Sequence, residues 1–245
     1  MAPYGVIYLL VAEYWGMRKV AIFDVDGTIF RSSLLIELVD IMIERKIFSP
    51  DVVVEYQVQK VKWLDRNGDY ESYIMAVVKA FMKNLKGVPF SEFEDACREV
   101  VSRYSDRTYR FTRDLLKQLK KDGYFLLAIS HSPKGVLDQF CPTLGFDKSY
   151  GMFYELGPSD RFTGKIIDEH LIKNKSAILK RAIVKEKLTL VGSIGVGDTE
   201  SDISFLELVE RPICFNPNEK LYKEAKRNGW DVIVERKDMI YNIKQ

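Results

Sequence analysis

Six polar side chains stand where apolar runs of this 245-residue sequence end or where an expected helix begins: Asp24, Asp26, Ser130, Lys175, Asp198 and Asp202. Asp24 and Asp26 follow the run 20–23, and Ser130 closes the run 124–130. Short apolar runs that end in polar residues predict buried strands. Because parallel strands place their ligands at their carboxyl ends, we expect these side chains to share one rim of a sheet.

The spacing of the aspartates suits them to metal binding. Asp24 and Asp26 are two residues apart, which puts both carboxylates on one side of an extended segment. Asp198 and Asp202 are four apart across a loop and a helix start, so they fall on one face. The sequence has 2 histidines and no Cys-x-x-Cys pair, so we expect any metal to be bound through oxygen. Oxygen ligands suit hard cations such as Mg²⁺.

The composition argues against several classes of protein. Lys plus Arg number 37 against 35 for Asp plus Glu, so the net charge of +2 gives no long-range field for nucleic-acid binding. The 3 cysteines are an odd set that fits reduced thiols, so we expect a cytoplasmic protein. The apolar stretch 4–12 is too short to cross a bilayer and follows no basic residue, so we expect no membrane segment.

The pattern of apolar residues changes along the chain. After residue 31, spacings of three and four predict successive helices, one of them beginning at a capping box on Ser91. After about residue 106, strand-like and helix-like segments alternate, with a small hairpin expected at 149–166, and this alternation predicts a parallel sheet. We expect three parts: an N-terminal extension (1–16), a doubly wound, Rossmann-like α/β core (17–31 and 106–245) and an all-helical cap inserted after the first strand (32–105).

Taken in chain order, the polar residues resemble the four motifs of the haloacid dehalogenase superfamily. Residues 24–28 match Asp-x-Asp-x-Thr, and residues 197–202 match Gly-Asp-x-x-x-Asp. Between them, Ser130 matches the Ser or Thr that ends the second strand, and Lys175 matches the motif lysine. The insert is similar to that of the phosphoserine-phosphatase-like subgroup. The resemblance implies a phosphoric monoester hydrolase that uses Mg²⁺ and acts on a small phosphorylated metabolite.

The resemblance and the charge of such a substrate together suggest a role for each residue. A phosphomonoester is a dianion, so a carboxylate that attacks it needs cations and hydrogen-bond donors close by. We expect Asp24 to be the nucleophile that forms an aspartyl-phosphate, and Asp26 to be the acid and base. Ser130 and Lys175 are expected to bind the phosphate. The resemblance also implies the metal ligands: the Asp24 carboxylate, the Asp26 main-chain carbonyl and Asp198, with Asp202 in or just behind that shell.

Several alternatives stay open at this stage. A phosphotransferase or phosphomutase would use the same two aspartates, and a phospho-acceptor module would use Asp24 without turnover. Lys173 competes with Lys175, and His131 is either structural or a contact to the leaving group. Segment 30–34 lacks the acid, and the third cap helix lacks the arginine, that phosphoserine-specific relatives share, which disfavours phosphoserine. Arg31 is either a surface residue or a contact to an anionic group of the substrate.

Aromatic residues recur at helical spacing in the expected cap. They are expected to be mostly core, with one or two lining the cleft. The residues concerned are Tyr56, Trp63, Tyr70, Tyr73 and Phe81.

Overall fold

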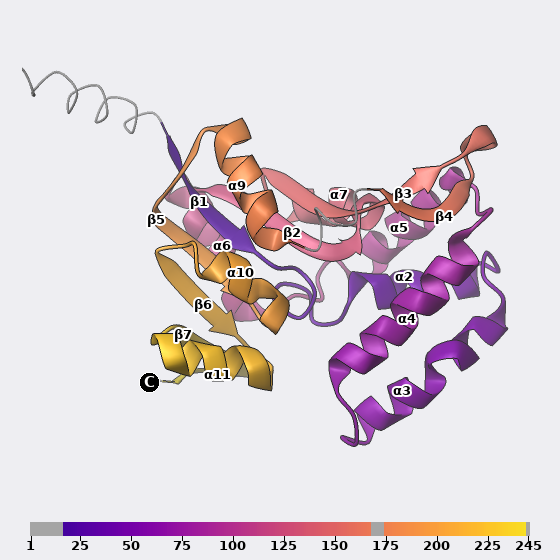
Figure 1. Cartoon of the computed structure of the whole chain (residues 1–245), viewed down its shortest axis with the longest axis horizontal. Coiled ribbons are helices and arrows are strands. Elements are labelled where there is room, and N and C mark those ends of the chain that lie inside the picture. The colour runs from indigo at the N-terminus through magenta and orange to yellow at the C-terminus, as the bar shows by residue number, and fades with distance from the viewer. Residues whose placement is uncertain (1–16, 168–173, 244–245) are drawn as a thin grey trace, which may run out of the picture.

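The computed structural model of the chain describes residues 17–167 and 174–243 (Figure 1). Its sheet has eight strands in the order β4-β3-β2-β1-β5-β6-β7-β8. The strands are β1 (Arg18–Phe23), β2 (Phe125–Pro133), β3 (Lys148–Leu156), β4 (Phe162–Ile167), β5 (Leu188–Gly197), β6 (Arg211–Phe215), β7 (Asp231–Arg236) and β8 (Met239–Ile243). The expected N-terminal extension, residues 1–16, lies outside the described part of the chain.

β1 lies between β2 and β5 and is covered on both faces. Residues 20–23 are 0% exposed, as expected for a strand of a parallel sheet with helices on either side. Phe23 pairs in parallel with Ala128 of β2 on one side and with Val196 of β5 on the other. The carboxyl ends of these three strands therefore meet at one rim of the sheet.

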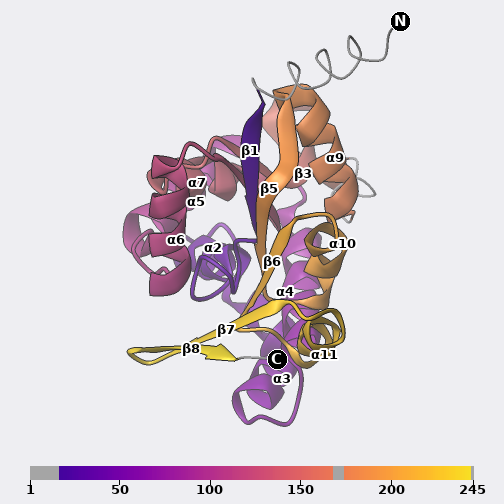
Figure 2. The same cartoon turned by 90° about the vertical axis from the view of Figure 1, so that its left-hand side faces the viewer.

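Helices cover both faces of the sheet, which confirms the doubly wound α/β fold (Figure 2). One face carries α6 (Arg110–Lys121) and α7 (Lys134–Thr143), and the other carries α9 (Lys175–Glu186), α10 (Ile203–Leu206) and α11 (Glu219–Asn228). A 3₁₀ turn, η3 (Glu200–Asp202), precedes α10. Two elements, α7 and β8, were not predicted from the sequence.

A block of helices follows β1, and we call it the cap. It contains α2 (Leu34–Glu44), η1 (Pro50–Val53), α3 (Val54–Leu64), α4 (Tyr70–Leu85) and α5 (Phe90–Tyr104). The side chain of Asp69 caps α4 by accepting a 2.7 Å hydrogen bond from the Ser72 N–H. The capping box expected at Ser91 was wrong: α5 begins one residue earlier, at Phe90, and its N-cap is Pro89, which makes no side-chain hydrogen bond.

The cap is joined to the core at two places by backbone hydrogen bonds. The two crossing segments pair with each other, since Arg31 N–H donates to Arg107 O and Tyr109 N–H donates to Ile29 O, both at 2.9 Å. At the other place, the turn between α4 and α5 is bonded to β4. Gly87 N–H donates to Phe162 O at 2.8 Å there.

The expected hairpin is confirmed as the antiparallel pair β3–β4, in which Phe153 lies opposite Ile167. The cap is therefore bonded to this hairpin as well as to the segments on which it crosses from the core. No described helix is both long enough and apolar enough to cross a membrane.

Candidate active site

A buried lysine holds two aspartates at the rim of the sheet. Lys175, in the first turn of α9, places Nζ 2.6 Å from Asp24 Oδ1 and 2.6 Å from Asp202 Oδ1. Its residue surface is 1% exposed. Burial alone would lower the pKa of Lys175, but the carboxylates of Asp202 and Asp24 outweigh it and raise that pKa. Lys175 is therefore a fixed cation beside the Asp24 carboxylate.

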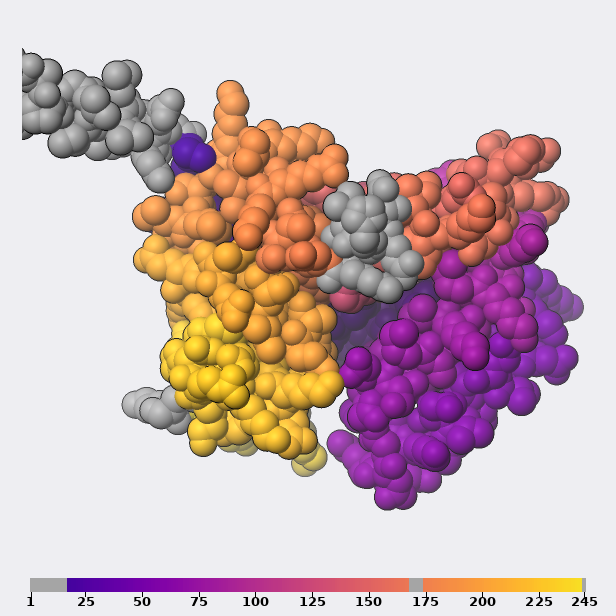
Figure 3. Space-filling view, viewed as in Figure 1, coloured from indigo at the N-terminus to yellow at the C-terminus, as the bar shows by residue number. Residues whose placement is uncertain are grey.

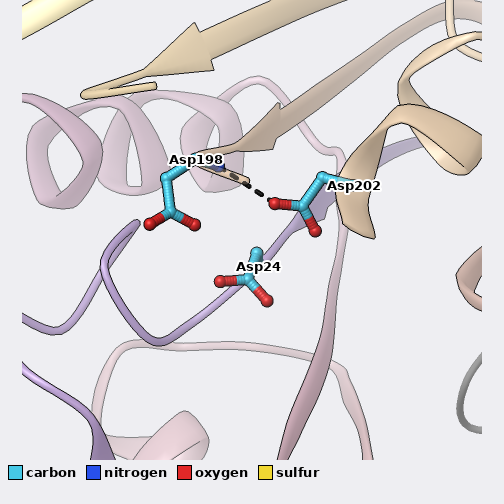
Figure 4. A group of neighbouring side chains, drawn as sticks. All are labelled: Asp24, Asp198 and Asp202. Atoms are coloured by element: carbon cyan, nitrogen blue, oxygen red, sulfur yellow. Dashed lines mark hydrogen bonds between the residues drawn. The ribbon is translucent and has the colours of Figure 1, made fainter. Parts of the chain in front are cut away.

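Asp24, Asp198 and Asp202 form a compact group of oxygen ligands (Figure 4). A carboxylate oxygen from each lies within 4.8 Å of the others. Asp202 is fixed by the N–H groups of Asp198 and Thr199, which donate to its Oδ2 at 3.0 and 3.1 Å. Thr28 Oγ1 donates to Asp198 Oδ1 at 3.2 Å.

The electrostatics of this group suit a divalent cation. Burial raises the pKa of Asp24 to about 8, with Lys175 opposing the shift and Asp202 and Asp26 adding to it. Burial and the neighbouring charge of Asp24 raise the pKa of Asp198 well above its usual range. Clustered carboxylates with raised pKa values are stabilised when a hard cation binds among them, so the donor set fits Mg²⁺.

Asp26 lies in a different environment from Asp24, although the two are only two residues apart. Its Oδ2 accepts hydrogen bonds from Ser130 Oγ at 2.8 Å and from Ser132 Oγ at 2.6 Å. Its Oδ1 accepts from the Leu34 N–H at 2.6 Å. Burial raises the pKa of Asp26, against the effect of these three hydrogen bonds. Its contacts are thus neutral donors, whereas Asp24 contacts a cation.

Two glycines allow the loops of the site to approach each other closely. Gly27 has φ of +80°, and a Cβ at that position would collide with Asp198 Oδ2. A Cβ on Gly197 would lie 2.5 Å from Cβ of Asp202. Both positions therefore require glycine, in the first motif because of its conformation and in the last because of its contact.

Known proteins resemble this chain in sequence and in fold. Residues 21–207 match the family described as haloacid dehalogenase-like hydrolase. The chain belongs to the haloacid dehalogenase-like hydrolase family. Histidinol-phosphatase of Neisseria meningitidis is 24% identical over 225 residues, covering 89% of this chain and 99% of the relative. Phosphoserine phosphatase SerB1 of Mycobacterium tuberculosis is 22% identical, covering 88% and 70%.

Solved structures share the fold. A phosphoserine phosphatase in apo form superposes with a TM-score of 0.62 at 21% identity, covering 90% of this chain and 95% of that chain. A Bordetella pertussis protein of unknown function superposes with a TM-score of 0.64 at 17% identity, covering 88% and 98%. Within its family the chain is therefore phosphoserine-phosphatase-like, and its relatives support a phosphoric monoester hydrolase.

All six predicted site residues lie at one rim of the sheet. Three further residues contact them or lie beside them. Thr28 contacts Asp198, and the threonine of the first motif could have indicated this role. Ser132 contacts Asp26 beside Ser130, and their spacing of two on a strand was the available signal.

His131, between these serines, is exposed, and Arg31 is exposed as well. Lys173, the competitor of Lys175, lies outside the described residues.

The third residue comes from the cap, where the sequence counted it among five aromatic residues of which one or two were expected to line the cleft. Tyr70 begins α4, and its phenol interacts with the side chain of Ser33, the residue before the Leu34 N–H that binds Asp26. Burial, followed by the charges of Asp26 and Asp198, raises the pKa of the Tyr70 phenol, so the hydroxyl stays neutral. Figure 3 shows a furrow between the core, in orange and yellow, and the purple helices of the cap. Tyr70 thus brings a cap hydroxyl toward the carboxylates of Asp26 and Asp198.

Proposed function

We propose that the chain is a Mg²⁺-dependent phosphatase that hydrolyses a small phosphomonoester through an aspartyl-phosphate on Asp24. One observation carries this proposal: Asp24 and Asp26 lie two residues apart but in unlike environments. Asp24 contacts the ammonium of Lys175 at 2.6 Å, and Asp26 contacts hydroxyl and amide donors. Two carboxyl groups in unlike environments can divide the roles of nucleophile and acid.

In the first step, a carboxylate oxygen of Asp24 attacks phosphorus and the bond between phosphorus and the ester oxygen breaks. Asp24 Oδ1 is bonded to Lys175, while Oδ2 accepts no hydrogen bond from the described residues and is available for attack. Asp26 gives its proton to the departing alkoxide, and its raised pKa favours the protonated form that this requires. The products of the step are an alcohol and an aspartyl-phosphate.

In the second step, Asp26 takes a proton from water as the water oxygen attacks phosphorus. The bond between phosphorus and Asp24 breaks, which frees inorganic phosphate and restores the carboxylate. Lys175 balances negative charge beside Asp24 in both steps. Mg²⁺ held by Asp24, the Asp26 carbonyl and Asp198, with Asp202 in or behind that shell, would neutralise charge on the phosphoryl oxygens. Ser130 is assigned to the phosphate as well as to Asp26.

Residues 32–105 are proposed to act as the cap that closes over the substrate. The relatives named for histidinol phosphate and phosphoserine suggest a small phosphorylated metabolite as the substrate class. At the rim of the cap, however, this chain presents the phenol hydroxyl of Tyr70, which lies beside the buried Ser33. We therefore propose a leaving group that offers hydrogen-bonding atoms near the scissile oxygen.

Phosphate release from a panel of phosphorylated metabolites, with and without Mg²⁺, tests this function. We expect turnover that stops on chelation and an acyl phosphate that hydroxylamine cleaves. Asp24→Asn should abolish both signals, while Asp122→Asn, a change at an exposed helix end, should leave them unchanged. Turnover by the Asp24→Asn variant would exclude Asp24 as nucleophile. A trapped phosphoryl group that leaves only to added alcohols would identify a phosphotransferase.

A further inference from the structure

Helix α3 is apolar on two opposite faces. On the inner face, Tyr56 is 2% exposed and packs with the aromatic residues of α4. On the outer face, four aliphatic side chains are exposed at spacings of four, three and three: Val54 at 73%, Val58 at 60%, Val61 at 42% and Leu64 at 64%. We call these four residues the α3 stripe. Their spacing places them along one side of the helix.

The α3 stripe is a contiguous apolar surface at the edge of the molecule. Figure 1 shows α3 beside α4, on the side of α4 that faces away from the sheet. Single exposed aliphatic residues, such as Val184 on α9, are ordinary in a folded protein. An apolar row on one helix is a different feature, since it exposes a continuous surface that association would remove from water.

Charges beside the α3 stripe indicate what covers it. Glu55 and Lys62 are seven residues apart, about two helical turns, so they lie on the same flank of the stripe. If a second copy packs its own stripe against this one in antiparallel orientation, a two-fold axis keeps equivalent flanks together. Glu55 then lies opposite Lys62 of the second copy, and the pair forms twice. Parallel packing would place this flank against the other flank instead.

Glu55 and Lys62 each have an atom available for such an ion pair. Lys83 Nζ lies 3.1 Å from Glu55 Oε1, and the Asn84 amide donates to the same oxygen at 3.2 Å. Both contacts use Oε1, so Glu55 Oε2 accepts no hydrogen bond from the described residues. Among those residues, Lys62 Nζ has no ion-pair partner.

We propose that this chain forms a two-fold symmetric dimer in which the α3 stripes of two copies pack antiparallel, flanked by reciprocal ion pairs between Glu55 and Lys62. One pair of helices buries less surface than a standard interface, so the dimer forms in a concentration-dependent way. The proposal does not depend on the catalytic assignment, because none of these residues lies at the rim that holds Asp24.

Sedimentation equilibrium of the full chain over a range of concentrations tests the dimer. The wild type should shift from monomer to dimer as concentration rises. Val58→Asp should raise the Kd at least about tenfold, because it places two charges at the apolar contact. Val184→Asp, the matched change on α9, should leave the Kd unchanged. The circular dichroism spectrum of each variant reports that the chain is folded.

Charge reversal tests the orientation. Glu55→Lys should weaken the dimer by about tenfold, through loss of two ion pairs and new repulsion. The double variant Glu55→Lys with Lys62→Glu should regain most of that loss. A wild type that is monomeric at every concentration overturns the proposal and leaves the stripe to another partner. A dimer that survives Val58→Asp also overturns it, and a dimer that the double variant fails to restore overturns the antiparallel arrangement.

Discussion

At the rim of the sheet, Lys175 lies 2.6 Å from each of two aspartates and is almost fully buried. Where the cap meets α11, Lys220 lies 3.4 Å from Glu71, and both side chains are about two-thirds exposed, at 67% and 64%. Removing one partner of a buried ion pair strongly lowers folding stability, whereas an exposed ion pair contributes little to it. The comparison indicates that the rim of the core depends on buried charges, whereas the contact between the cap and α11 depends on exposed ones.

The largest expected effect comes from removing the buried cation. Lys175→Met leaves the carboxylates of Asp24 and Asp202 buried without a positive partner. We expect stability to fall by about 3–5 kcal/mol and kcat to fall by at least about 10³-fold. Lys180→Met, an exposed change on the same helix, is the control. Urea unfolding and phosphate release measure the two effects, and a Lys175→Met variant as stable as the control would contradict the comparison.

A smaller effect is expected from Asp26→Asn, which removes the acid and keeps the shape. The amide can still accept from the Leu34 N–H and can contact the hydroxyls of Ser130 and Ser132, so stability should change little. We expect kcat to fall by about 10²–10⁴-fold. The phosphorylation step should fall less with p-nitrophenyl phosphate than with an alkyl phosphate, because nitrophenolate leaves without a proton. Equal losses for both substrates in single-turnover measurements would remove Asp26 as the acid.

The smallest effect is expected in the cap. Tyr70→Phe removes the hydroxyl that interacts with Ser33 and should lower kcat/KM by about two- to tenfold. Tyr73→Phe, one turn further along α4, is the matched control because its ring packs against Tyr70. We expect the control to leave kcat/KM unchanged. If both variants lose activity equally, Tyr70 acts through packing of the cap and has no specific contact with the substrate.

The ends of the strands could be predicted from the sequence, because an apolar run followed by polar residues is a pattern within a few neighbouring positions. The run 20–23 fixes β1, and Asp24 and Asp26 follow from its end. Ser132 lies two residues after Ser130, so the alternation of side chains along β2 places both on one face. It was missed because β2 extends to Pro133, directly before α7 begins at Lys134. β8 was missed because it is an exposed edge strand without a buried run.

The sequence could not single out Tyr70 among the cap aromatic residues, because its position depends on how distant segments pack. Tyr70 and Tyr73 look alike in the sequence, three residues apart on one helix. Only the placement of α4 over the rim brings Tyr70, and not Tyr73, next to Ser33. The capping box at Ser91 was predicted wrongly because the helix begins earlier. The carbonyl of Pro89 already accepts a hydrogen bond from the Phe93 N–H.

The attachment of α4 has a mechanical consequence. Near its C-terminal end, the backbone of Gly87 is bonded to Phe162, while its N-terminal end is held to α11 by the exposed contact between Glu71 and Lys220. The helix has 16 residues, so it is a rod of about 24 Å. Turning this rod by about 10° about its fixed end carries Tyr70 through about 4 Å. Such a rotation would move Tyr70 relative to the rim while leaving the hydrogen bonds of the sheet in place.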